Sequence, residues 1–268
     1  MPDTAAHAEL IHTHLWHEEP EAGDPFATRT ARCRGYDVFG ELVGQASWAE
    51  MLLLLWQGER PSPAAARLFE ALAVALANAG PRDAAVHAAM CGAVGGSPAA
   101  ACLMAALAVG AGRFGGGQEV ALAMQLWQRG GTDLAAWQQA LGDPPTEVAS
   151  IWPRAEHPPG LDPHGPRCAT TVVQALDALA RLSPGPRLAW LQAERKALEA
   201  AAGHPLAMAG VAAAALADLG FSPEQGEMLF LLLRLPGAAA HALEQRLAYK
   251  RFPFFGHEID PGAAHEHT

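Results

Sequence analysis

The sequence predicts an all-α protein, and three observations support this fold class. Half of the 268 residues are hydrophobic, so the chain can bury a sizeable core and is not expected to be disordered. Ala and Leu are abundant, whereas there are only two Tyr and nine Phe, a balance that favours helix packing. Apolar residues recur at helical spacing between breaks made by Gly and Pro, and no stretch gives convincing sheet pairing.

The first helix signal follows a polar N-terminal segment. Residues 1–27 are expected to form a mobile arm, and residues 32–38 show enough alternation for a short strand or extended segment. Ser47 and Glu50 then match a capping box, which opens a helix that ends at Gly58. Further helices are expected over residues 62–79, 82–93, 98–109, 120–129, 132–141, 170–182, 186–202, 206–219, 222–233 and 238–249.

A glycine-rich stretch, residues 110–119, lies between two of these helices. Its three adjacent glycines, Gly115, Gly116 and Gly117, allow a close approach of the backbone and accept positive φ without steric cost. The amide groups at the start of the following helix are also open to an anionic or carbonyl oxygen. A plain helix–helix turn accounts better for the glycines alone, so a ligand role depends on the motif that contains them.

Composition bounds the partners and the location. The formal net charge of −10 and the lack of a basic stripe argue against a nucleic-acid partner. No apolar run is long enough to span a bilayer, and the polar N-terminus is unlike a signal peptide, so a cytoplasmic protein is expected. The four cysteines have no paired spacing, and neither a disulfide nor a metal is expected. Because a negative field repels anions, any anion site must be a local cluster of arginines.

Three separated segments resemble the citrate synthase superfamily. Residues 34–37 (RGYD), followed by residues 53–61 (LLLWQGERP), are similar to its N-terminal signature. Residues 112–116 (GRFGG) resemble a turn of ATP-citrate lyase and the citryl-CoA lyases, and residues 234–245 (RLPGAAAHALEQ) resemble the closing helix of the family. The resemblance covers roughly residues 28–256. It is closest to the branch of the citryl-CoA lyases and the C-terminal module of ATP-citrate lyase.

This resemblance implies a fold, an assembly and a substrate class. The implied fold is a large helical domain, residues 28–121 with 207–256, and a smaller helical domain, residues 122–206, with the active cleft between them. A mobile tail is expected over residues 257–268. The family resemblance also implies a homodimer that acts on small molecules, an acyl-CoA thioester (coenzyme A as part of the substrate) and a keto acid, with no metal. Such chemistry needs a positioned base and guanidinium groups that hold carboxylates.

Matching the family residue by residue implies a set of site residues. His164 is the only imidazole near the position of the family's keto-polarising His, and Asp162 is a candidate catalytic carboxylate. Arg167, Arg234 and Arg251 match arginines that bind the carboxylates of the substrate, with Arg251 supplied by the second subunit. The three adjacent glycines are the expected contact for the coenzyme A moiety.

The chain departs from the family at the catalytic base. Ala209 stands where the family has the Asp that moves a proton at the acyl carbon, and Ala79 stands where it has an upstream His. Asp218 lies more than two turns further along the same helix, too far to substitute for that Asp. Asp162 and Glu119 are the nearest carboxylates to the motifs and are therefore the candidates for a replacement base.

Two functions from different classes follow from these residues. The first is an enzyme that makes or breaks a carbon–carbon bond between an acyl-CoA and a keto acid, as citryl-CoA lyase and citrate synthase do. The alternative is a catalytically impaired paralogue that binds coenzyme A or a di- or tricarboxylate, or that partners an active subunit. A dimeric structural partner without any ligand is a third possibility.

Overall fold

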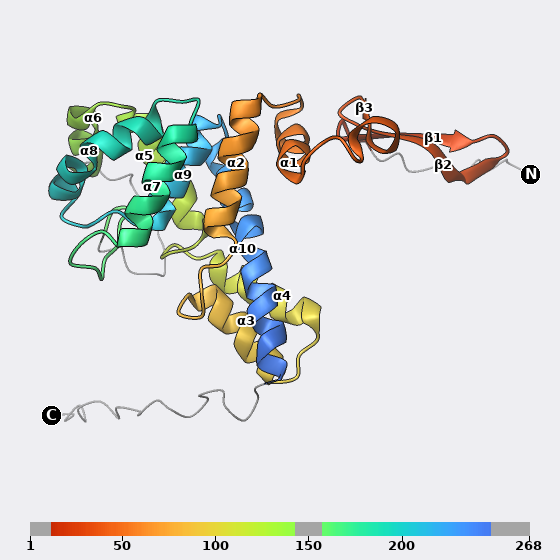
Figure 1. Ribbon diagram of the computed structural model, residues 1–268. Helices are drawn as coiled ribbons and strands as arrows, with labels where there is room; N and C mark the ends of the chain where they lie inside the picture. The colour runs from red at the N-terminus through yellow and green to blue at the C-terminus, as the bar shows by residue number, and fades with distance from the viewer. Residues whose placement is uncertain (1–11, 143–156, 248–268) are drawn as a thin grey trace, which may run out of the picture. The chain divides into compact units, whose positions relative to one another are not determined.

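The computed structural model describes residues 12–142 and 157–247, and helices dominate these residues (Figure 1). The described part begins with three strands, β1 Trp16–Glu21, β2 Asp24–Cys33 and β3 Tyr36–Asp37, and a short π-helix, η1 Val38–Leu42. The α-helices that follow are α1 Trp48–Gln57, α2 Pro63–Leu76, α3 Ala84–Val94, α4 Ala99–Gly110, α5 Gly117–Gly130, α6 Leu134–Gly142, α7 Thr170–Leu182, α8 Arg187–Ala202, α9 Met208–Asp218 and α10 Pro223–Arg246. The predicted helical fold class is confirmed.

The start of α1 shows why helix positions were predictable. Ser47 accepts a hydrogen bond from the amide of Glu50, and the Glu50 carboxylate accepts one from the amide of Ser47 at 2.7 Å. These bonds satisfy amide groups that have no partner inside the helix. Gly58 ends the helix at a φ of 89°, a left-handed conformation that glycine adopts without strain.

The chain divides into two compact units. The first unit comprises Met1–Ala73 and Val120–Gly226, and the second comprises Val74–Glu119 and Glu227–Thr268. Three helices, α2, α5 and α10, each continue from one unit into the other. These divisions fall at other positions than the domain boundaries expected from the sequence, and those boundaries stay a prediction.

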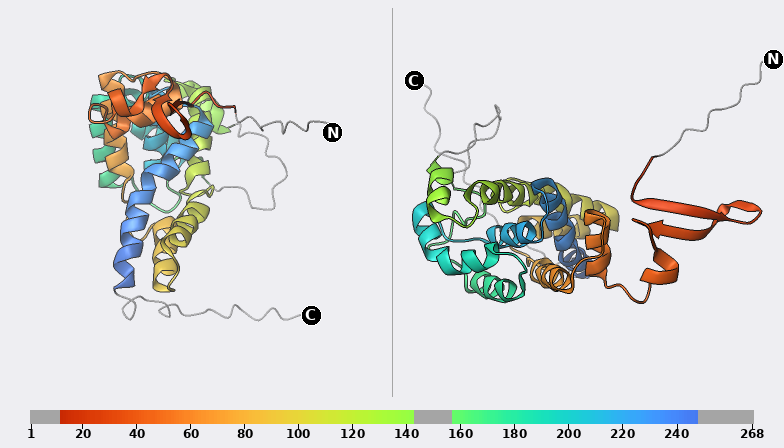
Figure 2. Two further views of the ribbon diagram at one scale, coloured as in Figure 1. Left: turned by 90° about the vertical axis from the view of Figure 1, so that its right-hand side faces the viewer. Right: turned by 90° about the horizontal axis from the view of Figure 1, so that it is seen from above.

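Helix α9 forms the centre of the first unit. Every residue from Ala209 to Leu216 is buried, and the side chains from Val211 onward have no exposed surface. Helices α7 and α8 pack on each other and on α9, and α6 packs on α8 (Figures 1 and 2). The run of alanines explains this position, because small side chains let several helices approach one axis closely.

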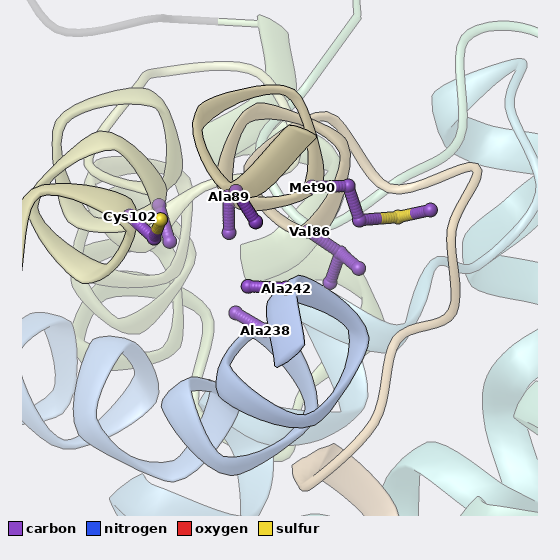
Figure 3. Close-up of a cluster of buried hydrophobic side chains, with 8 residues drawn as sticks. Val86, Ala89, Met90, Cys102, Ala238 and Ala242 are labelled. Carbon is purple, nitrogen blue, oxygen red and sulfur yellow. The ribbon is translucent and has the colours of Figure 1, made fainter. Parts of the chain in front are cut away.

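The second unit has its own small core. Helices α3 and α4 pack together beside the C-terminal part of α10 (Figure 1). Figure 3 shows their contact, where the side chains are mostly small. The cluster consists of Val86, Ala89, Met90, Ala93, Cys102, Ala106, Ala238 and Ala242. None of the helices in the described residues is long and apolar enough to cross a membrane.

The N-terminal strands contradict the expectation that no stretch forms a sheet. Strands β1 and β2 pair antiparallel from Trp16 opposite Cys33 to Glu21 opposite Asp24, and β3 pairs with β2. The turn contains Gly23 at a φ of 82°. Most residues of the hairpin are exposed, so it lacks the apolar alternation that reveals a half-buried strand. Residues 1–11 of the expected arm, and the tail 257–268, lie outside the described residues.

Helix α10 also differs from the prediction. Two helices were expected, over residues 222–233 and 238–249, but one helix runs from Pro223 to Arg246 through Pro236. A proline inside a helix removes one hydrogen bond of the helix. The next amide, that of Gly237, donates to the carbonyl of Ala77 at 2.7 Å. A side chain at 237 would lie 2.4 Å from that oxygen, so the glycine permits this contact with the segment after α2.

Candidate functional site

A loop in the first unit, residues 157–168, is fixed to the start of α9. The amide of Asp162 donates to the carbonyl of Pro205 at 2.7 Å, and the amide of Ala207 donates to the carbonyl of Gly160 at 3.0 Å. Leu161 and Leu206 form an antiparallel bridge between these segments. Loop 157–168 therefore lies directly against the residues that precede Ala209.

Two glycines make this contact possible. Gly160 has a φ of 86°, and a Cβ atom on it would lie 2.9 Å from the Cα atom of Gly210. A Cβ atom on Gly210 would lie 2.4 Å from the carbonyl oxygen of Gly160. Real Cβ atoms do not approach so closely without a shift of the backbone. The sequence thus needs glycine at both positions to hold the loop on α9.

The predicted catalytic residues lie in this loop, with different environments. The Asp162 carboxylate accepts a hydrogen bond from the amide of His164 at 2.9 Å. A Cβ atom on Gly165 would lie 2.6 Å from the other oxygen of Asp162, so the glycine lets the chain pass close to this half-buried carboxylate. The side chains of His164 and Arg167 are exposed. The loop therefore presents an imidazole and a guanidinium group to solvent while Asp162 shapes the turn.

Position 209 offers no acid or base. Ala209 lies in the first turn of α9 with only 6% of its surface exposed. The side chain of Asp218, at the other end of α9, has no exposed surface, and its carboxylate accepts hydrogen bonds from the amides of Arg187 and Leu188 and from the hydroxyl of Ser183. Asp218 thus caps the start of α8, and its carboxylate is committed to that structural contact.

An open hollow of about 510 Å³ lies beside Arg167. We call it the basic hollow, because three of its lining side chains are cationic and a fourth is an imidazole. These side chains are Arg167, Arg195, Lys196 and His204. The chain has a net charge of −10, so this cluster is a local concentration of positive charge on a negatively charged protein. Sequence reasoning required a cluster of this kind but did not find Arg195 and Lys196, because α8 carries no motif.

Glu199 balances part of this charge. Its carboxylate is 2.8 Å from Arg195 and also accepts the amide of Leu206 at 3.0 Å. The hydrogen bond to Glu199 raises the pKa of the Arg195 guanidinium, which stays charged. Within the described residues, Arg167 and Lys196 have no acidic partner. Cys168 also lines the hollow; burial, with the negative charge of Glu199 as a further cause, raises the pKa of its thiol.

In the second unit, Arg234 of α10 is held by its own chain. One terminal nitrogen donates to the carboxylate of Asp83, and the other donates to the carbonyl of Gly115 at 3.1 Å. The guanidinium carbon also lies over the ring of Phe230, 4.8 Å from its centre. Asp83 therefore supplies the opposite charge that an arginine on an otherwise apolar helix needs.

Gly115 and Gly116 lie in the tight turn between α4 and α5, and Gly117 is the first residue of α5. Gly115 has a φ of 69°, and its amide donates to the carboxylate of the buried Glu119. A Cβ atom on Gly116 would lie 2.4 Å from the carbonyl of Gly112, and one on Gly117 would lie 3.0 Å from Leu231. Contacts within the unit thus explain these glycines. Their contact with coenzyme A and a role of Glu119 as base stay predictions.

The predicted residues that the structure describes fall into one set within each unit. Asp162, His164 and Arg167 lie close to the start of α9 in the first unit, and Arg234 lies beside the glycine turn in the second. Arg251 lies outside the described residues. The roles of all these residues as ligand or catalytic groups stay predictions.

Comparison with known proteins identifies the fold. No family model matches the chain, and no curated protein matches it. Among solved structures, citryl-CoA lyase from Hydrogenobacter thermophilus is similar with a TM-score of 0.72 and 19% identity, covering 96% of both chains. The chain has a citrate-synthase-like fold.

Two ATP-citrate lyase structures share this fold over part of their length. The enzyme from Methanothrix soehngenii, in complex with citrate and coenzyme A, matches with a TM-score of 0.69 and 19% identity over 97% of this chain and 43% of that one. An Asp-to-Ala variant of the enzyme from Methanosaeta concilii, in complex with (3S)-citryl-CoA, matches with a TM-score of 0.68 and 18% identity over 96% and 42%. The present chain therefore spans less than half of these two proteins.

Proposed function

We propose that this protein binds an acyl-CoA thioester and a keto acid or its condensation product, and makes or breaks the carbon–carbon bond between them. Citryl-CoA is the first substrate to test. The observation that carries the proposal is loop 157–168, docked on α9 beside a basic hollow, in a fold shared with citryl-CoA lyase. A hollow with exposed cations suits a ligand with phosphate and carboxylate groups.

Each side chain of the loop has a chemical role in this proposal. His164 polarises the keto group by donating a hydrogen bond as negative charge develops on its oxygen. Arg167 holds a carboxylate through its guanidinium fork, and Arg251 of the second subunit adds a further cation. Asp162 is the candidate for the proton transfer that Ala209 cannot perform, which requires its turn to open during the reaction.

A specific observation favours the second candidate, a protein that binds these ligands without turnover. Ala209 is buried and offers no group for proton transfer, and the carboxylates of Asp162, Asp218 and Glu119 each already accept hydrogen bonds from groups of this chain. One of the similar structures is an Asp-to-Ala variant that holds (3S)-citryl-CoA. A protein of this fold with an Asp replaced by Ala thus still binds that compound, and the same is proposed for this chain.

The proposal includes a homodimer. In the second unit, Met104 and Val109 of α4 and Met228 and Leu243 of α10 are exposed apolar side chains, and their burial against a second copy would stabilise a dimer. We expect a dimer that buries more than about 1,600 Å² in total. A cytoplasmic location and action on small molecules, without nucleic acid or membrane, belong to the same proposal. Light scattering at micromolar concentration that gives the mass of a monomer would contradict the dimer.

One experiment separates the candidate functions. The protein is incubated with citryl-CoA while the release of acetyl-CoA and oxaloacetate is followed, and the binding of citryl-CoA is measured by calorimetry in parallel. Release at a rate that scales with protein concentration supports the enzyme. Binding without release supports the paralogue. If the protein neither binds nor cleaves citryl-CoA, both candidates are wrong. The remaining hypothesis is then a structural partner that binds no ligand.

A further inference from the structure

Arg234 already has an acidic partner from its own chain. Both terminal nitrogens of its guanidinium group are engaged, one by Asp83 and one by the carbonyl of Gly115, and Phe230 lies against its face. Only 12% of the Arg234 side chain is exposed. An arginine binds a carboxylate most strongly through two parallel N–H donors, and Asp83 occupies one of the two terminal nitrogens.

The two oxygens of Asp83 have different tasks. Oδ1 accepts hydrogen bonds from the amides of Ala85 and Val86, both at 3.1 Å, and so caps the start of α3. Oδ2 accepts the hydrogen bond from Arg234. When Arg234 turns to another acceptor, Oδ1 keeps its two donors, and water can reach Oδ2 because 21% of the Asp83 side chain is exposed. The contact is therefore one that a ligand can displace.

We infer that Asp83 is a specificity-determining residue, an internal carboxylate that competes with carboxylate ligands for Arg234. This inference rests on the proposed function, since it takes Arg234 as a ligand-binding arginine. A ligand carboxylate that reaches Arg234 must displace Asp83 and then lies beside it, and two carboxylates that share one site repel each other. Citrate and related acids consequently bind more weakly than the arginine alone would allow.

The test is the variant Asp83→Asn. Asparagine caps helices about as well as aspartate, so the bonds to Ala85 and Val86 are kept while the negative charge beside Arg234 is removed. Calorimetry with citrate is expected to show affinity about tenfold tighter than that of the parent, in the range for one charged hydrogen bond. Combining Asp83→Asn with Arg234→Gln is expected to abolish the gain.

Asp133→Asn is the matched control. Asp133 is also an N-terminal cap, that of α6, where its carboxylate accepts the amide of Ala135 at 2.9 Å. Asp133→Asn removes a negative charge from a residue that is distant from Arg234 in the sequence, and it is expected to leave citrate affinity unchanged. Asp83→Ser, which keeps a capping oxygen, serves as the second variant if thermal melting shows that Asp83→Asn does not fold.

The outcomes separate this inference from the function on which it rests. Binding of acetyl-CoA is measured on the same proteins. If acetyl-CoA binds but citrate affinity is the same in the parent and in the Asp83 variants, the competition is refuted while the proposed function stands. If no protein of the series binds either compound, both are refuted. An equal gain in Asp133→Asn would show a general effect of charge and would also overturn the inference.

Discussion

In the first unit, the cations of loop 157–168 and α8 face an open hollow, whereas in the second unit the arginine of α10 is enclosed by groups of its own chain. Arg167 and Lys196 line the hollow, while Arg234 contacts Asp83, the Gly115 carbonyl and the Phe230 ring. Both regions contain an arginine that matches the same family. Only one of the two arginines is ready to accept a ligand without first breaking an internal contact.

This difference shows what a motif does and does not specify. The motif fixes where an arginine stands on its helix or loop, and residues outside the motif decide whether it is engaged. Asp83, which engages Arg234, is separated from it by 151 positions. A ligand role for a matched arginine is therefore tested at its neighbours as well as at the arginine itself.

The largest expected effect concerns position 209. Ala209→Asp places a carboxylate at the start of α9, beside loop 157–168, and general base catalysis contributes about 10²–10⁴-fold. The parent is therefore expected to act weakly or not at all on citryl-CoA, and Ala209→Asp is expected to raise the rate. Because position 209 is buried, a carboxylate there also costs about 1–3 kcal/mol of stability, which urea unfolding would detect.

Ala207→Asp is the control for this prediction. It adds the same group two residues earlier, at the cap of α9, where a carboxylate favours the helix, and no gain in rate is expected. A parent protein that cleaves citryl-CoA at about 1–10³ s⁻¹, the usual range for enzymes, would show that another residue is the base. Asp162 and Glu119 would then be the first positions to mutate.

The next effect tests whether loop 157–168 is held on α9 as closely as the two glycines imply. Gly160→Ala adds a Cβ atom 2.9 Å from Gly210 and 3.2 Å from Ala123. Strain at positive φ and overpacking together are expected to cost about 2–4 kcal/mol, measured by urea unfolding. Gly203→Ala is the matched control, because Gly203 has a φ of 73° but no atom within 4 Å of the added Cβ.

The control separates the two sources of the cost. Gly203→Ala is expected to cost only the conformational part, about 1 kcal/mol. Equal losses in both variants would mean that the contact between Gly160 and Gly210 does not constrain the loop. In that case, loop 157–168 would not be held on α9 by this contact, and the first unit would lose the fixed position that it gives to His164 and Arg167.

Much of the fold was predictable because helix ends are local. Ser47 with Glu50, and Gly58, set the ends of α1 through bonds to residues within one turn. The hairpin over Trp16–Cys33 was missed, because its exposed strands have no apolar alternation. The unbroken α10 was missed because the amide of Gly237 finds its acceptor at Ala77, far away in the sequence.

The candidate site was predictable where a motif names the residue. Arg167 and Arg234 were found in this way. His164 was chosen as the only imidazole near the family's position, and the structure places it in one loop with Arg167. Lys196 and Asp83 were not found, because their significance depends on which segments the fold brings beside them. Ala209 is the reverse case, since the sequence identified the missing acid and the structure adds that the position is buried.

A smaller effect is expected from the cations of the basic hollow. Lys196→Ala and Arg167→Ala should each weaken acetyl-CoA binding by about 0.5–1.5 kcal/mol, the usual range for one net hydrogen bond near a surface. The loss should shrink as salt is raised, because exposed charges are screened. Arg181→Ala, which removes an exposed cation from the end of α7 in the same unit, should change the affinity little. Equal losses of acetyl-CoA affinity in all three variants would mean that the net charge of the protein, and not the basic hollow, determines binding.

The smallest effect is the response of Cys168 to pH. Burial raises the pKa of its thiol above the ordinary value of 9.0, and the charge of Glu199 adds to this. The folded protein therefore holds this proton more tightly than the unfolded chain, so the contribution to stability is complete below pH 9.0 and is lost as the pH rises through the folded value. Since the thiolate is the reactive form, iodoacetamide at pH 8 should modify Cys168 more slowly in the folded protein than in the urea-unfolded protein.

Acetyl-CoA should slow the reaction of the folded protein further if it fills the hollow that Cys168 lines. Mass spectrometry after timed quenching measures both rates. If the Cys168 thiol reacts as fast in the folded protein as in the unfolded protein, the fold does not shield it.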